Sequence, residues 1–115
     1  MLNQRAIITI LTIFCEVNMD FRNEQTDRLI KAILNLQNEQ ECYDFFEDLC
    51  TIKEIQDMSQ RLEAAKRLYD GENYLAISRE IGISTATISR VSRCLNYGNG
   101  GYKTAIERMN EDENK

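Results

Sequence analysis

The stretch that decides the fold is NYLAISREIGISTATISRVSRCL, residues 73–95. Apolar residues recur in it at helical spacing on both sides of Gly82, which predicts two short helices joined by a tight turn. Glycine suits this turn because it adopts a positive φ without a Cβ clash. Ser78 is small where the two helices must approach closely, and the hydroxyl of Ser84 can cap the second helix. This combination is typical of a helix-turn-helix that places its second helix in the major groove of DNA.

Two other interpretations of the same stretch remain open. Its apolar positions would also suit an ordinary corner between two helices of a core. A helix-turn-helix can instead dock another protein, and the acidic surface of this chain is compatible with such a helical interaction module. The second helix is rich in Ser, Thr and Arg, which favours DNA binding over the ordinary corner. The apolar positions are Ile77, Ile81, Ile83, Ile88 and Val91.

Composition restricts both the fold and the chemistry. A chain of 115 residues with no proline and five glycines favours a single all-α domain. Histidine is absent, so the commonest general base and the commonest metal ligand are both missing. We therefore expect neither an enzyme nor a metal site. The cysteines form no C-x-x-C pair and indicate small buried hydrophobic side chains in a reducing cytoplasm. They are Cys15, Cys42, Cys50 and Cys94.

Charge is distributed unevenly along the chain. The net charge is −5, which by itself argues against a nucleic-acid partner. Residues 58–103, however, hold seven basic and four acidic side chains, whereas residues 16–57 hold four basic and eleven acidic ones. Local charge decides phosphate contact, so the helix-turn-helix region remains suited to double-stranded DNA. We expect that binding to be sensitive to salt.

The first 18 residues differ in pattern from the rest. Their apolar run from Ala6 to Val17 is too short to span a bilayer as a helix, and no small-x-small cleavage site follows it. A second methionine, Met19, precedes the well-patterned part. We therefore expect residues 1–18 to be an extension from an upstream start codon, and we expect a cytoplasmic protein without membrane association.

The remaining chain predicts six helices in one domain, residues 20–110. The first spans residues 23–37, the second starts at Asn38, and a capping box of Thr51 and Glu54 opens a long third helix. Gly71 ends that helix as its first residue beyond the C-cap. The helix-turn-helix follows at residues 73–95, with a glycine-rich loop after it. A last helix covers residues 102–110, and residues 111–115 are expected to be disordered.

From Thr51 to Leu95 the sequence resembles the core of the Trp repressor superfamily, and more narrowly its YerC/YecD-type proteins. The most specific parts are L-x-x-G-E at residues 68–72 and I-G-I-S-x-A-T-I-S-R at residues 81–90. The resemblance covers residues 20–109. It implies a six-helix domain, an intertwined homodimer whose early helices interlock, and a DNA-binding transcriptional regulator, most simply a repressor.

The second helix of the helix-turn-helix carries the expected contacts to DNA. Its first residues normally reach base edges, where short hydroxyls and a methyl group can read bases. Later polar residues on its groove-facing side should contact phosphates, as should one arginine of the preceding helix. The expected DNA-binding residues are Arg79, Ser84, Thr85, Ala86, Thr87, Ser89, Arg90 and Arg93.

The resemblance also implies an effector pocket. Arg61 and Arg90 match the two arginines that hold tryptophan in the family, and Thr51 matches a lining residue. Val91, however, stands in place of a glycine and adds bulk where the indole would need space, while Cys94 replaces a serine. We therefore expect no tryptophan corepressor and no other cofactor, and leave open a different small effector at this pocket. The two arginines would otherwise contact phosphate or nearby acidic side chains.

Overall fold

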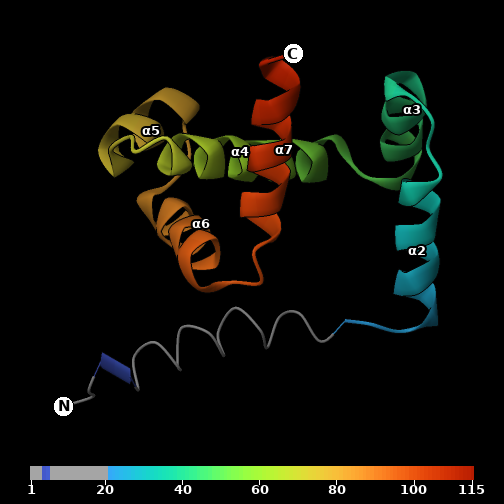
Figure 1. The fold of residues 1–115 in the computed structure, drawn as a ribbon, viewed down its shortest axis with the longest axis horizontal. Helices are drawn as coiled ribbons and strands as arrows, with labels where there is room; N and C mark the ends of the chain where they lie inside the picture. The colour runs from blue at the N-terminus through green and yellow to red at the C-terminus, as the bar shows by residue number, and fades with distance from the viewer. Residues whose placement is uncertain (1–3, 6–20) are drawn as a thin grey trace.

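A computed structural model of the chain describes residues 4–5 and 21–115. The expectation for residues 1–18 falls almost entirely on residues outside this part. Within residues 21–115 the chain forms six α-helices and no strand, which confirms the predicted all-α class (Figure 1). None of the described helices is long and apolar enough to cross a membrane. The helices are α2 (Glu24–Leu34), α3 (Glu39–Leu49), α4 (Ile52–Tyr69), α5 (Tyr74–Ile81), α6 (Thr85–Tyr97) and α7 (Gly101–Glu113).

Side-chain caps begin the helices at the predicted residues. The Asn23 side chain accepts a hydrogen bond from the Thr26 amide at 3.0 Å, and the Thr26 hydroxyl oxygen accepts one from the Asn23 amide at 2.8 Å. Asn38 caps α3 through its side chain. Thr51 caps α4 by accepting from the Glu54 amide at 3.1 Å, but its hydroxyl then donates to the Glu54 carboxylate. The expected caps are therefore confirmed, and the one at Thr51 differs from a full capping box.

The first helix is shorter than predicted. It ends at Leu34 rather than residue 37, because Asn35 turns its side-chain amide back to the Lys31 carbonyl at 2.8 Å. That bond satisfies one of the carbonyl groups left open at a helix end. An asparagine side chain can replace a backbone donor in this way, and the spacing of apolar residues does not reveal it. The pattern therefore predicted a helix end that was too late.

The last helix is longer than predicted. We expected residues 111–115 to be disordered, but α7 continues to Glu113. Its inner face carries Ile106, which is fully buried, and Met109, which packs against the core. Near its end, the Glu113 carboxylate lies 3.9 Å from the Lys66 ammonium of α4. Packing along α4 thus supports a helix whose last residues are acidic and polar.

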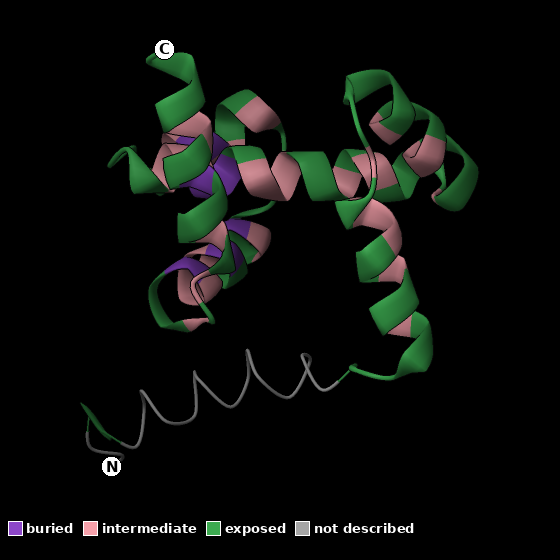
Figure 2. Cartoon of the chain, turned by 45° about the vertical axis from the view of Figure 1, so that its right-hand side comes forward, coloured by how far each residue is buried: buried purple, intermediate pink, exposed green. Residues whose placement is uncertain are grey.

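All buried residues of the described chain belong to α4–α7. These four helices pack together, whereas α2 and α3 contribute no buried residue (Figure 2). We call α2 and α3 the α2–α3 arm; it lies at the N-terminal end of α4, away from α5 and α6 (Figure 1). One chain therefore has a core at one end and an open arm at the other. The core residues are Ala64, Ala65, Ile77, Ile88, Val91, Leu95 and Ile106.

The described cysteines are less buried than expected. Cys42, Cys50 and Cys94 are each half-buried within one chain. Cys42 lines an apolar groove of about 410 Å³ between the arm and α4. Its exposure therefore belongs to the same open region as the arm itself.

Candidate nucleic-acid interface

Gly82 and Ser78, both singled out in the sequence, hold the turn between α5 and α6. Gly82 has a φ of 79°, and its amide donates to the Ser78 carbonyl at 2.9 Å. The Ser78 hydroxyl donates to the Ile83 carbonyl at 2.6 Å across the turn. Ser78 is therefore more than a small residue at a close approach, because its hydroxyl fixes the path of the chain into α6.

The cap of α6 uses two of the expected DNA-contacting hydroxyls. Ser84 accepts a hydrogen bond from the Thr87 amide at 3.1 Å, and the two side-chain oxygens lie 2.9 Å apart. Thr87 is half-buried and faces α4. Thr85 remains exposed at the first position of the helix. The structure thus separates Thr87 from the outward residues, because helical spacing turns it toward the core.

The remaining α6 residues divide into an inner and an outer face. Ile88, Val91 and Leu95 are buried, so the opposite side of the helix points to solvent. On that side Ala86 and Arg90 are exposed, while Ser89 and Arg93 are half-buried. We call this side the outer face of α6. The expected residues that it brings together are Ala86, Ser89, Arg90 and Arg93.

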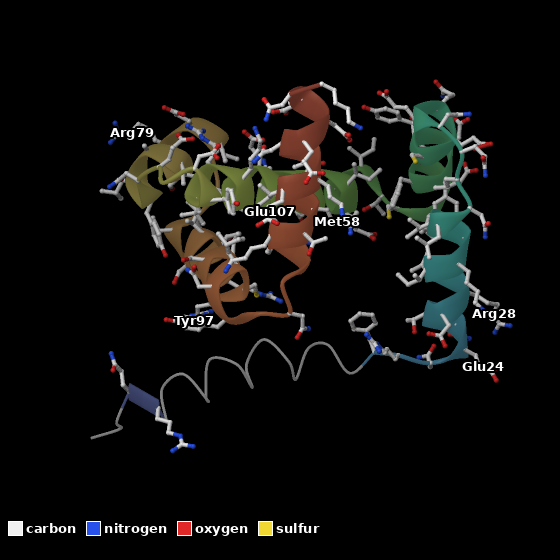
Figure 3. The ribbon with its side chains drawn as sticks, in the orientation of Figure 1. Glu24, Arg28, Met58, Arg79, Tyr97 and Glu107 are labelled. Atoms are coloured by element: carbon white, nitrogen blue, oxygen red, sulfur yellow. The ribbon has the colours of Figure 1, made fainter. Side chains whose placement is uncertain are left out.

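Tyr97 belongs to the outer face but was absent from the expected contacts. It lies one turn beyond Arg93, is 41% exposed, and sits at the C-terminal end of α6 (Figure 3). The spacing from Arg93 is the signal that would have found it. It was missed because the helix was expected to end at Leu95, two residues too early.

The charge of this surface is positive. The sequence of α6 contains Arg90 and Arg93 and no acidic residue, and its N-terminus adds the partial positive charge of the helix dipole. Arg79 is exposed in the last turn of α5 (Figure 3). The acidic residue beside it, Glu80, is paired with Arg67 of α4. Within residues 73–97 three arginines face this single acidic residue, so the local charge is positive.

A cleft of about 390 Å³ opens between α4 and the turn before α6. We call it the Arg61 cleft; α4 lines one side and Gly82 and Thr87 lie on the other. Thr51 caps α4 ten residues before Arg61, which places the two about 15 Å apart along the helix. Arg90 is not among the lining residues. A single chain therefore does not bring the three expected effector residues together. The α4 residues of the cleft are Lys53, Asp57, Gln60 and Arg61.

Tyr102 of α7 interacts with both arginines of the expected effector pocket. Its half-buried phenol interacts electrostatically with Arg61, and more weakly with Arg90 and Cys94. Burial raises the pKa of Tyr102 above its ordinary value, although the positive charge of Arg61 acts in the opposite direction. Nothing in the sequence pointed to Tyr102, because α7 and α4 are distant in the chain and meet only in the fold.

The family model described as Trp repressor protein matches residues 24–110. The chain belongs to the Trp repressor family. The uncharacterized protein YerC of Bacillus subtilis (strain 168) is similar to this chain, with 54% identity over 92 residues that cover 80% of this chain and 88% of YerC.

Two solved structures of the Trp repressor family have the same fold. A candidate Trp repressor from Staphylococcus aureus superposes with a TM-score of 0.76 at 51% identity, covering 80% of this chain and 92% of that one. A TrpR-like protein from Eubacterium eligens ATCC 27750 superposes with a TM-score of 0.75 at 52% identity, covering 77% of this chain and 92% of that one. The resemblance and the six-helix fold predicted from sequence are thereby confirmed.

Proposed function

We propose that this protein is a sequence-specific DNA-binding regulator of transcription, acting as a repressor, that inserts α6 into the major groove. The observation that carries the proposal is the outer face of α6, where Arg90 and Arg93 lie opposite a fully buried face. Membership of the Trp repressor family supports a regulator rather than an enzyme.

The outer face suggests a division of roles. Thr85 and Ala86 stand exposed at the start of α6, the end that reaches base edges in this kind of motif. Arg79, Arg90 and Arg93 are suited to phosphate contacts, which position the helix without specifying sequence. Ser84 and Thr87 act mainly by forming the cap, since their hydroxyls already bond to each other.

The working unit in this proposal is an intertwined homodimer. The α2–α3 arm has no buried residue, and its large apolar side chains include Leu34, which is 77% exposed, and Tyr43, which is 63% exposed. The groove beside it is lined mainly by apolar side chains, among them Phe46 and Met58. A second copy of the chain would cover both surfaces. Two α6 helices would then meet half-sites about one helical turn apart.

We further propose that DNA binding does not require tryptophan. Val91 is 1% exposed within the core, so its side chain fills space between the helices. Tyr102, a residue of the chain itself, already interacts with both Arg61 and Arg90. The Arg61 cleft is lined mostly by polar and charged groups, which suit an indole poorly.

Selection of bound DNA from a random pool, with and without tryptophan, tests these proposals. We expect enrichment of a pseudo-palindromic site to the same extent in both pools. Arg93→Ala should then weaken binding to every sequence and lower the salt slope by about one, because one phosphate contact is lost. Arg28→Ala is the matched control, since Arg28 is an exposed arginine of α2, far from α6 (Figure 3). An Arg93→Ala protein with unchanged affinity and salt slope would contradict the assigned outer face.

A second candidate function is docking of another protein through the helix-turn-helix. The observation that favours it is a pair of exposed apolar residues at the start of α5, namely Tyr74, 41% exposed, and Leu75, 63% exposed. A mobility-shift assay with genomic fragments at low salt separates the two functions. Complete absence of a shift at low salt would favour protein docking, whereas a salt-sensitive shift supports DNA binding.

A further inference from the structure

Arg67, near the C-terminal end of α4, makes a cluster of charged contacts that the outer face of α6 does not include. Its Nη2 atom lies 2.6 Å from the Glu72 carboxylate, and its Nε atom donates to both oxygens of the same group at 3.0 and 3.1 Å. Nη2 also pairs with the carboxylate of Glu80. The Arg67 side chain is 18% exposed, far less than its partners Glu72 at 39% and Glu80 at 59%.

These contacts join three consecutive segments of the chain. Arg67 belongs to α4, Glu72 to the connection after it, and Glu80 to the last turn of α5. A backbone hydrogen bond also joins Arg67 and Glu72, since the Arg67 carbonyl accepts a hydrogen bond from the Glu72 amide at 3.0 Å. Gly71 makes this possible with a φ of 87°. Arg67 therefore holds the connection at both its backbone and its side chain, and also reaches the far end of α5.

Because Glu80 lies at the end of α5 that precedes α6, the cluster can affect the position of α6. The eight residues of α5 span about 12 Å, so a rotation of about 5° at its start would move its far end by about 1 Å. Gly82 and α6 follow directly after that far end. An ion pair at Glu80 thus acts where a small change of angle would displace α6 the most.

We propose that the Arg67–Glu72–Glu80 cluster sets the angle between α4 and α5, and thereby makes Arg67 a positioning residue for α6. The inference rests on the proposed DNA-binding function, because its consequence is the spacing of two α6 helices in a dimer. Arginine suits the role since its planar guanidinium offers Nε and Nη2 to one carboxylate while Nη2 also reaches a second. Lysine would supply the charge as a single point without this fixed geometry.

The first test needs no DNA. Residual dipolar couplings of the backbone amides in the full-length protein report the orientation of α5 and α6 relative to α4. We expect Arg67→Met to rotate α5 and α6 together, and Glu80→Gln, which removes only the α5 link, to produce a smaller rotation in the same sense. Lys66→Met is the matched control, because it removes the same charge from the neighbouring residue, whose ion pair is with Glu113 of α7 at 3.9 Å and not with Glu80.

The second test measures binding to the selected DNA and to the same DNA reduced to one half-site. We expect Arg67→Met to weaken binding to the two-half-site DNA by about fivefold or more, a typical coupling between linked sites, with little change on one half-site. Arg67→Lys should recover only part of the loss. A merely structural role would instead weaken both DNAs equally.

The two tests fail separately. If the unaltered protein bound no DNA, the proposed function would be wrong, while the dipolar couplings would still decide whether Arg67 sets the angle. An unchanged orientation in both Arg67→Met and Glu80→Gln would overturn the positioning role. Where Arg67→Met does not fold, Arg67→Lys and Glu80→Gln supply the same comparison.

Discussion

Ser78 illustrates how much depends on a single hydroxyl in this protein. It is half-buried between α5 and α6, and its bond to the Ile83 carbonyl crosses the turn that directs α6 toward solvent. An acceptor left without a donor at such a site costs more than the average hydrogen bond contributes. The residue therefore links the local turn geometry to the placement of the outer face.

Ser78→Ala is expected to lower the free energy of unfolding by about 1–2 kcal/mol, because the Ile83 carbonyl would lose its partner in a half-buried site. Urea unfolding at neutral pH measures the change. Ser59→Ala is the control, since that hydroxyl makes a 2.7 Å bond to the Ile55 carbonyl on an exposed face within one helix. Equal losses in the two variants would contradict a special role for the turn.

Glu72 predicts a response of stability to acid. Its hydrogen bond with Arg67 lowers the pKa of the Glu72 carboxyl below the ordinary value of 4.5. The folded protein therefore binds this proton less readily than the unfolded chain, so the stabilisation is complete above pH 4.5 and is lost as the pH falls through the lower, folded value. At neutral pH, Glu72→Gln should have a lower free energy of unfolding than the unaltered protein. This difference should become smaller in that acidic range. Thermal unfolding from pH 7 to pH 3 checks this, and a gap independent of pH would disprove it.

At the scale of elements, the junction between α6 and α7 depends on a close backbone approach. A Cβ built on Gly98 would lie 2.4 Å from the Cys94 carbonyl oxygen. This glycine has a φ of −85°, so the requirement is space and not conformation. The junction places α7 so that Tyr102 lies close enough to Arg61 and Arg90 to interact with their charges.

Gly98→Ala should therefore destabilise the protein by about 1–3 kcal/mol, because a backbone carbonyl must move to admit the methyl group. Gly101→Ala is the matched control; a Cβ there meets nothing within 4 Å, and the residue begins α7. We expect it to be neutral or slightly stabilising, as alanine favours helices. Chemical denaturation of both variants checks the pair. Similar effects from both would show that the junction tolerates a side chain.

What the sequence predicted well was local. The caps at Asn23, Asn38 and Thr51 and the turn at Gly82 depend on residues within four positions of one another, so their chemistry is visible in the sequence. The cluster at Arg67 was missed because Glu80 lies thirteen residues away and meets it only after α4 and α5 fold against each other.

The sequence also did not predict which way some side chains of the candidate site face. The sequence correctly predicted that α6 carries polar residues beside an apolar face, but it could not show that Thr87, expected among the base-reading residues, lines the cleft beside α4. Thr87 turned inward because the buried face is fixed by Ile88 and Val91 together with α4. Tyr102 could not be predicted at all, since only the packing of α7 on the bundle brings it near Arg61.

At the scale of the whole molecule, the described chain is a core with an uncovered arm. Leu34 of the arm is 77% exposed, so a charge there should cost little in a single chain. In the proposed dimer the same charge would be buried without a partner, which is strongly unfavourable.

Leu34→Asp is therefore expected to shift the protein from dimer toward monomer, with a mass near the 13.4 kDa of one chain. Analytical ultracentrifugation over a range of concentrations measures this. Leu75→Asp is the matched control, because Leu75 is 63% exposed on α5, outside the arm. A monomeric unaltered protein at micromolar concentration would rule out the proposed dimer.

The division between core and arm also affects how quickly the proposed dimer can form after synthesis. Helices α4–α7 hold every buried residue of the described chain, so they can assemble by fast local packing as soon as they are synthesised. The apolar side chains of the arm would become buried only when a second chain binds. With an association rate of about 10⁶ M⁻¹s⁻¹, chains at about 10 nM would need on the order of 100 s to meet. A burst of synthesis would thus shorten the delay before the protein becomes competent, and slow synthesis would lengthen it.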